Sequence, residues 1–272
     1  LTNLTLVQGR TQLAFSGQGD LATKHFQTAV NGQLDAASAR PFLPFGNLVN
    51  GFAALTTNTP LALALDVRGN WQTLDDLMAT GRVTLGRTHL ELAAQGNAVT
   101  KNFHGAVSGR FDIEDARPFL TDSNAAKGFT IVTTSEPLVL TLDVNGNWLT
   151  LTNLTATGSV ALTNFAVRGQ TIDSVAARLA YADGLLQFLQ PELRRAGGAQ
   201  WMTGDAVVMD FKRMMMTFSN GFSVVDPVAL TSAIGPKTAE HLEPYHFLKA
   251  PTARVNGCLP LRDMNGPDDM VG

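Results

Sequence analysis

A tandem repeat with a fixed spacing dominates the chain. The stretch LALALDVRGNW begins at Leu61, and the closely similar LVLTLDVNGNW begins 77 residues later at Leu138. With the same shift, residues 13–85 align with residues 90–162 without a gap, at roughly half identity. Tandem self-similarity is typical of arrays in which neighbouring units complete one another's hydrophobic core. We therefore expect a duplicated unit rather than a domain with one specialised pocket.

A third, more diverged copy follows the first two. In the first copy, two glycines at strand ends, Gly32 and Gly69, lie 37 residues apart, and the second copy repeats this spacing. In the last third of the chain, Gly221 and Gly257 lie 36 residues apart. A terminal repeat often differs from the internal ones. We predict a first β repeat over residues 1–89, a second over residues 90–162 and a diverged C-terminal unit over residues 163–272.

Each unit contains segments in which apolar and polar residues alternate. In LALALDVRG, every second residue from Leu61 is leucine or valine, with Asp66 and Arg68 between them. Successive side chains of a strand point to opposite faces, so the pattern predicts antiparallel strands with one apolar face, in an all-β repeat fold. The residues expected on the apolar faces are Leu61, Leu63, Leu65, Val67, Leu138, Leu140, Leu142, Val144, Val207, Met209, Phe211, Met214, Met216 and Phe218.

Turns and short helices separate these strands. Asp183–Gly184, inside AYADGLLQF, predicts a tight hairpin. DPVALTSAIG, residues 226–235, has an N-cap aspartate, proline at the first helical position and a terminal glycine, which predicts a helix. Two further segments predict only a turn or two of helix each, because they begin with a capping aspartate and contain proline. They are DAASARPFL, residues 35–43, and DIEDARPFL, residues 112–120.

Composition excludes several functional classes. The chain has 272 residues, of which 44% are hydrophobic and 16% charged, with a net charge of −3 and no Lys/Arg cluster. We expect no nucleic-acid partner. No window approaches the roughly 18 apolar residues of a membrane-spanning helix. Cys258 is the single cysteine, so the chain forms no internal disulfide. The sequence starts at Leu1 in mid-pattern, which we interpret as a piece of a longer protein.

The motifs of catalysis and metal binding are missing from the sequence. There is no nucleophile elbow, phosphate-binding loop or dinucleotide fingerprint. EHLEPYH, residues 240–246, is the only dense metal-capable cluster, and it lacks the histidine pair of a zinc-protease helix. The segment DMNGPDD, residues 263–269, lacks the spacing of a calcium loop. We expect a protein that is not an enzyme, with no metal and no cofactor.

The third unit resembles a known family. It reads ARLAYADGLLQFLQPELRRAGGAQWMTGDAVVMDFKRMMMTFSNGFSVVDPVALTSAIGP over residues 177–236. Its hairpin, double glycine, TGD strand end and DP helix resemble the C-terminal region of AsmA-like proteins. Residues 65–85, which lie upstream, resemble the same superfamily, which includes TamB-like proteins. Their sequence, LDVRGNWQTLDDLMATGRVTL, has its G…L…L…G-x-V-x-L pattern.

The resemblance implies a repeating β-groove, a long curved sheet with a hydrophobic trough. It would lie in the periplasm or cell envelope of a diderm bacterium and associate with membranes through regions not present in this sequence. Its function would be to bind or conduct lipid acyl chains in outer-membrane biogenesis or intermembrane lipid transport. The partners would be phospholipid or another lipid, membrane-anchored regions of the parent protein and other envelope proteins. The fourteen apolar-face residues would line the groove.

Other interpretations remain open. An apolar sheet face is hidden from water by a second sheet, by helices or by lipid, and alternation alone does not separate these cases. The alternative function is a structural or adhesive β-repeat protein with a closed core and no lipid. A third class, a hydrolase acting through carboxylates, is disfavoured because the repeat keeps its apolar positions and changes its charged ones: Arg68 becomes Asn145, and Asp75 becomes Thr152.

Overall fold

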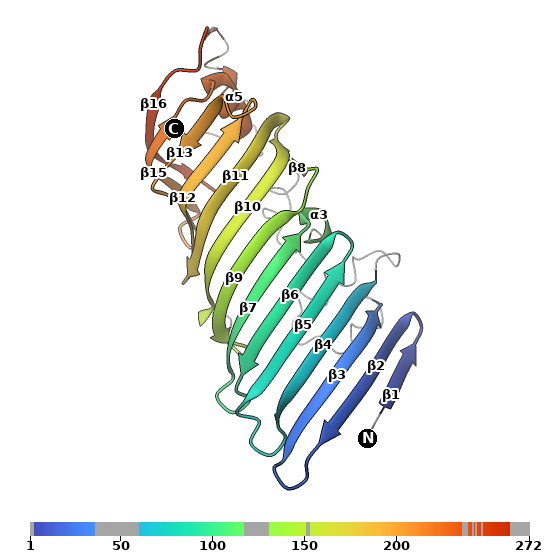
Figure 1. Cartoon of the computed structure of the whole chain (residues 1–272). Helices are drawn as coiled ribbons and strands as arrows, with labels where there is room; N and C mark the ends of the chain where they lie inside the picture. Colours follow the sequence, from blue (N-terminus) through green and yellow to red (C-terminus); the bar gives the residue numbers. More distant parts are fainter. Residues whose placement is uncertain are drawn as a thin grey trace. The chain divides into compact units, whose positions relative to one another are not determined.

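The protein is almost entirely antiparallel β-sheet, as the sequence predicts. The structure, a computed structural model, describes residues 3–35, 60–116, 131–150, 153–235, 239–240, 242, 244–245 and 247–261. Within these residues there are sixteen strands in one sheet and two short helices, α3 and α5 (Figure 1). The strand order follows the chain from β1 to β7 and continues β9-β10-β11-β12-β13-β15-β14. β8 pairs with β10, and β16 with β15.

The elements have the following bounds. The first eight strands are β1 (Asn3–Gln8), β2 (Thr11–Gly19), β3 (His25–Leu34), β4 (Leu61–Asn70), β5 (Leu77–Leu85), β6 (Thr88–Gly96), β7 (Asn102–Phe111) and β8 (Val132–Thr134). The others are β9 (Leu138–Asn147), β10 (Thr155–Val167), β11 (Gln170–Ala182), β12 (Leu185–Arg195), β13 (Gln200–Thr203), β14 (Ala206–Asp210), β15 (Met215–Ser223) and β16 (Ala253–Pro260). The helices are α3 (Ile113–Ala116) and α5 (Pro227–Ile234).

The chain divides into two compact units. Unit 1 comprises Leu1–Thr121 and Val139–Thr155, and unit 2 comprises Asp122–Leu138 and Ala156–Gly272. Among the described residues, the buried apolar side chains gather mainly in unit 2. The buried apolar residues of unit 2 are Leu162, Phe165, Ile172, Ala177, Met216, Val225, Ala229 and Ala239, against Leu13, Leu85 and Leu140 in unit 1.

The sequence repeat is also a structural repeat. Strands β2, β3 and β4 have the bounds of β6, β7 and β9 after a shift of 77 residues. The connecting turns repeat too. The side chain of Asp20 accepts the backbone N–H of Ala22 at 2.7 Å, and its counterpart Asn97 accepts that of Val99 at 2.9 Å. Both copies therefore use the same side-chain-capped turn, which Asp and Asn form equally well.

Strand register places the apolar residues of unit 1 on one face. Leu65 of β4 lies opposite Val30 of β3, and Leu63 lies opposite Val83 of β5. Val83 in turn lies opposite Leu90 of β6. Since directly opposite residues share a face, the apolar side chains of adjacent strands form continuous rows. The other face is mainly polar, although it also carries Met78 and Val139, and its exposed positions include a cross-strand ion pair of 3.1 Å between Arg82 and Glu91.

A buried polar corner connects β6 to α3 in unit 1. Asp112, only 1% exposed, accepts the N–H of Glu114 at 2.9 Å and pairs with the Arg87 guanidinium at 3.1 Å. The Thr88 hydroxyl accepts the N–H of Asp112 at 2.9 Å, and it donates to Asp115. Asp112 therefore caps α3 as the sequence predicts, and it also fixes the helix to the sheet.

In unit 2, one strand has two neighbours on the same edge. The hairpin between β11 and β12 turns at Asp183–Gly184, whose φ angles of 51° and 81° confirm the predicted tight turn. The first half of β12 pairs with β14, and its second half pairs with β13. The change of partner occurs at Gln190, which has a φ of 50°. A local irregularity at this point lets β12 support two separate strands.

The predicted DP helix is confirmed as α5. Asp226 is its N-cap and accepts the N–H of Val228 at 3.1 Å, and Pro227 begins the helix. Gly235 ends it in an extended conformation, with its N–H bonded to Thr231 O. Residues 36–43, 117–120 and 262–272 lie outside the described residues, as do His241, Glu243 and His246. The first ARPFL segment, part of the metal-capable cluster and the DMNGPDD segment fall there.

Candidate functional site

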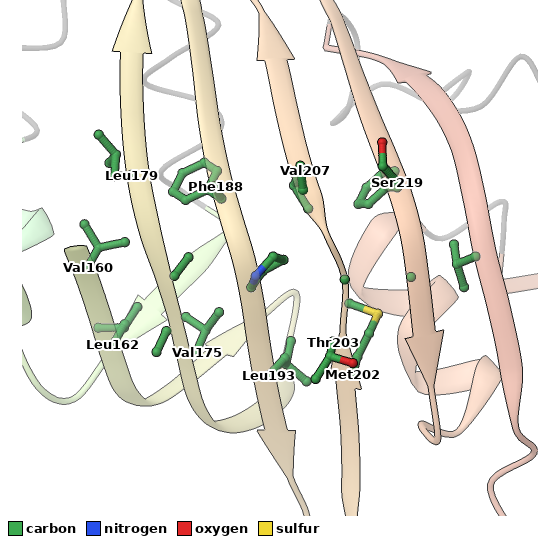
Figure 2. Close-up of a pocket in the computed structure, with 18 of the residues that line it drawn as sticks. Val160, Leu162, Val175, Leu179, Phe188, Leu193, Met202, Thr203, Val207 and Ser219 are labelled. Carbon is green, nitrogen blue, oxygen red and sulfur yellow. The ribbon is translucent and has the colours of Figure 1, made fainter. Parts of the chain in front are cut away.

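Unit 2 contains an apolar hollow of about 420 Å³ (Figure 2). The residues that line it are Leu138, Val160, Leu162, Val175, Ala176, Ala177, Leu179, Phe188, Pro191, Leu193, Met202, Thr203, Gly204, Ala206, Val207, Phe218, Ser219, Gly221 and Val255. They come from β9 to β16, and the close-up shows the labelled side chains spread over neighbouring strands. The volume lies within the range typical of small-molecule sites in proteins.

Cross-strand register aligns the aromatic centre of the hollow. Phe188 of β12 lies opposite Leu179 of β11 on one side and opposite Val207 of β14 on the other. Val207 is itself opposite Phe218 of β15. Four adjacent strands therefore contribute one apolar side chain each to a single row.

A second row lies further along the same strands. Leu193 of β12 is opposite Val175 of β11 and opposite Met202 of β13. The hollow thus extends along β12 from Phe188 to Leu193, across the position where β12 changes partner. A flexible methionine in the lining can adjust to ligands of different shape.

The boundary between β13 and β14 forms part of the hollow. Gln190 N–H donates to Asp205 O at 2.8 Å, and Gly204 N–H donates to Pro191 O at 3.2 Å, so backbone bonds hold both sides of the boundary. Pro191 and Gly204 are themselves lining residues. Because the backbone groups here are paired with each other, they are withdrawn from the apolar surface of the hollow.

The chemistry of the lining favours binding over catalysis. Among the described lining residues, Thr203 and Ser219 carry the only polar side chains, and none is charged. A surface of this kind excludes water and stabilises hydrocarbon, at about 25 cal/mol per Å² of apolar area buried. It offers no acid, base or anchored nucleophile.

The structure places the predicted apolar-face residues in four groups. Leu138, Val207 and Phe218 line the hollow, while Met209 and Met216 face each other one step further along β14 and β15. Phe211 and Met214 lie in the turn between these strands, and Phe211 is 46% exposed. The members in the repeat are Leu61, Leu63, Leu65, Val67, Leu140, Leu142 and Val144; of these Leu140 is buried and the others are half-buried.

Sequence reasoning did not single out the other residues of the hollow. Leu179 and Phe188 flank the Asp183–Gly184 hairpin, and their alternation on both sides of the turn was the available signal. Leu193 lies on β12, which changes its partner at Gln190, and Met202 lies on β13, the new partner; no local pattern indicates this change.

Unit 1 has a second, polar hollow of about 600 Å³, lined in part by Asp20, His25 and Arg68. The backbone N–H groups of Ala22 and Thr23 bond to the Asp20 carboxylate and lower its pKa. Both bonds go to Oδ1, so this carboxylate serves as the cap of the turn.

The described residues were compared with the requirements of metal sites and of membrane-spanning helices. No three His, Cys, Asp or Glu residues gather there as metal ligands. His104 contacts Asn145 Oδ1 at 2.8 Å through Nδ1 on the polar face of unit 1. No described helix has the length and apolar character to cross a membrane.

Comparison of the chain with protein-family models, curated proteins and solved structures gave no match.

Proposed function

We propose that the chain is a non-catalytic module of a bacterial cell envelope that binds lipid acyl chains on its apolar sheet faces. The observation that carries the proposal is the hollow of unit 2, about 420 Å³, with an uncharged lining. Its lining includes both the Phe188 row and the Leu193 row, so an extended hydrocarbon chain would contact both. A closed protein core would instead pack these side chains against one another without a hollow of this size.

Two further observations support the proposal. In unit 1, the apolar residues of β4 are half-buried, although their positions on one face are kept in both repeats. The resemblance to AsmA-like proteins, carried by residues 65–85 and 177–236, independently suggests acyl chains as the ligand. The periplasmic location and a role in intermembrane lipid transport or outer-membrane biogenesis belong to the same proposal.

The test combines native mass spectrometry with lipid extraction on the purified chain. We expect bound phospholipid or fatty acid that is released only on denaturation, and displacement of a fluorescent fatty acid by unlabelled oleate. A well-folded chain with a lipid-free mass and no binding of the fluorescent fatty acid would contradict the proposal and favour a closed structural repeat.

A matched pair of substitutions locates the binding surface. Val207 lines the hollow, whereas Val208 is paired with Gln187 and Thr217 on the opposite face of the same strand. We expect Val207→Asp to weaken fatty-acid binding at least tenfold, because a carboxylate in the hollow must be desolvated, and Val208→Asp to leave it within twofold. Equal effects of the two variants, with both folded by circular dichroism, would place the ligand elsewhere.

A further inference from the structure

Strand β1 presents an open sheet edge. Within the described residues it pairs with β2 alone, and all six of its residues are exposed. Three of them are apolar: Leu4 is 54% exposed, Leu6 41% and Val7 64%. Proteins usually protect such edges with charge, proline or a covering segment, because an exposed apolar edge pairs with other strands. The β1 sequence, NLTLVQ, carries none of the protective residues.

The repeat identifies β1 as the counterpart of β5. A shift of 77 residues places Asn3–Gln8 on residues 80–85, the last six residues of β5. The two-residue turns that follow agree, since Gly9 and Gly86 have φ angles of 60° and 55°. The next strand also begins in the same way, because Thr11 and Thr88 are both buried and each accepts a backbone N–H from an aspartate 24 residues later.

In β5, the counterpart of β1, the edge that corresponds to the open edge of β1 is paired with another strand. β5 pairs with β6 on one side and with β4 on the other. On the β4 side, Leu63 lies opposite Val83 and Leu65 lies opposite Gly81. Val83 is half-buried by these neighbours, whereas its counterpart Leu6 is exposed. The exposure of β1 thus corresponds to the absence of a β4-type strand at this edge in the described structure.

Register shows which backbone groups are available at the edge. Gln8 and Thr11 close a two-residue hairpin loop, so they form a hydrogen-bonded pair, and the pairing alternates from there along the ladder. Val7, Thr5 and Asn3 fall on the positions that are not bonded to β2. Their N–H and C=O groups therefore point outward, and Leu4 and Leu6 lie on the same face as Phe15 and Leu13 of β2.

We propose that the open edge of β1 binds an antiparallel strand of the β4 type. The occupant is a strand with leucine or valine at every second position and polar residues between, belonging to another repeat of the same class. Backbone hydrogen bonds to Thr5 and Val7 would supply affinity, and the alternating apolar residues would fix the register through contact with Leu4 and Leu6. The proposal concerns strand pairing and is independent of whether the chain binds lipid.

The test uses the whole chain and a synthetic peptide with the β4 sequence, LALALDVRGN, extended by lysine at both ends for solubility. Hydrogen exchange is measured for the β1 amides at increasing peptide concentration. We expect exchange at Thr5 and Val7 to slow at least tenfold at saturation, and a scrambled peptide of the same composition to have no effect.

Variants of the edge make the result specific. Thr5→Pro removes an outward N–H but no bond to β2, so we expect it to abolish peptide protection while the β2 amides stay protected. Val7→Lys, which leaves the backbone intact, should weaken binding through charge at the edge. No protection by millimolar peptide would overturn the proposal. So would protection that rises with chain concentration without peptide, since this would identify a second copy of β1 as the occupant.

Discussion

Two glycines of β7, four residues apart, are expected to respond to alanine in opposite directions. Gly109 has a φ of 141°, and a Cβ atom built on it would lie 2.1 Å from the carbonyl oxygen of His89 on the neighbouring strand. Gly105 has no such backbone angle, and its Cβ would meet Ala93 O and Ala94 Cβ at 3.4 Å. The two sites share a strand and face the same neighbouring strand, β6, so each is a control for the other.

The magnitudes follow from these contacts. At Gly109, alanine would adopt a conformation that costs about 1–3 kcal/mol, and moving the β6 carbonyl away would weaken a ladder hydrogen bond by about 1 kcal/mol more. We expect Gly109→Ala to lower the free energy of unfolding by about 2–4 kcal/mol. Gly105→Ala should raise it by about 0.4–1 kcal/mol, because alanine restricts the unfolded chain and fits the native backbone.

The first repeat supports this assignment. The counterpart of Gly109 is Gly32, whose φ is 148° and whose Cβ would lie 1.9 Å from Gln12 O. The counterpart of Gly105 is Thr28, so the backbone there accepts a larger side chain. Thr28 faces Gly17 in the first copy, and Gly105 faces Ala94 in the second. The glycine and the larger residue of this cross-strand pair have therefore changed places between the two copies.

Denaturant unfolding followed by tryptophan fluorescence measures both effects. In a Trp201→Phe background, the two remaining tryptophans, Trp71 and Trp148, belong to unit 1 together with β7. The m-value should stay constant, so that a change in midpoint reports stability alone. A Gly109→Ala variant within 0.5 kcal/mol of the parent, or a Gly105→Ala variant destabilised to a similar extent as Gly109→Ala, would refute the reasoning.

Three other predictions concern single side chains. Asp112→Ala should lower the free energy of unfolding by about 2–3 kcal/mol, measured by urea unfolding, because a helix cap and a charged hydrogen bond are lost together; a change below 0.5 kcal/mol would contradict this. Asp20 has a lowered pKa, so the stability that it contributes is present above the ordinary carboxyl pKa and is lost as pH falls through the lowered one. Asp20→Asn, which copies Asn97, should remove this acid-side dependence in thermal melts from pH 2 to 5, and an unchanged dependence would exclude Asp20 as its source. Phe211→Ser should reduce stability by about 1 kcal/mol or less and leave fatty-acid binding unchanged in titrations, because Phe211 is 46% exposed outside the hollow; weakened binding would place it in the site.

Local patterns predicted those features whose cause lies within a few residues. The strands β4 and β9 follow from alternation, the hairpin at Asp183 follows from its turn residues, and α5 follows from its cap and proline. Alternation did not show where a strand ends, however. It placed Phe211 on β14, although Asp210 accepts the N–H groups of Lys212 and Arg213 and so begins the turn one residue earlier.

Features that depend on distant strands were not predictable in this way. The hollow includes residues from β12 and from both of its partners, β14 and β13, and a single sequence contains no signal for that change of partner. The conformation of Gly109 has the same origin, since the close carbonyl belongs to another strand. The sequence indicated which faces are apolar, whereas the strands that bring these apolar residues together in the hollow are distant in the sequence.

The matching bounds of the repeated strands have a consequence for how such a protein can evolve. From β2 to β6 one repeat adds four strands, which corresponds to about 19 Å across the sheet at the usual spacing of about 4.8 Å between strands. Because β2, β3 and β4 begin and end at the backbone positions of β6, β7 and β9, duplication of a 77-residue coding segment adds strands of matching length and register. The width of a sheet of this kind can therefore be adjusted in discrete steps by gene duplication, with each new copy free to diverge afterwards, as the exchanged Gly17–Thr28 and Ala94–Gly105 pairs have done.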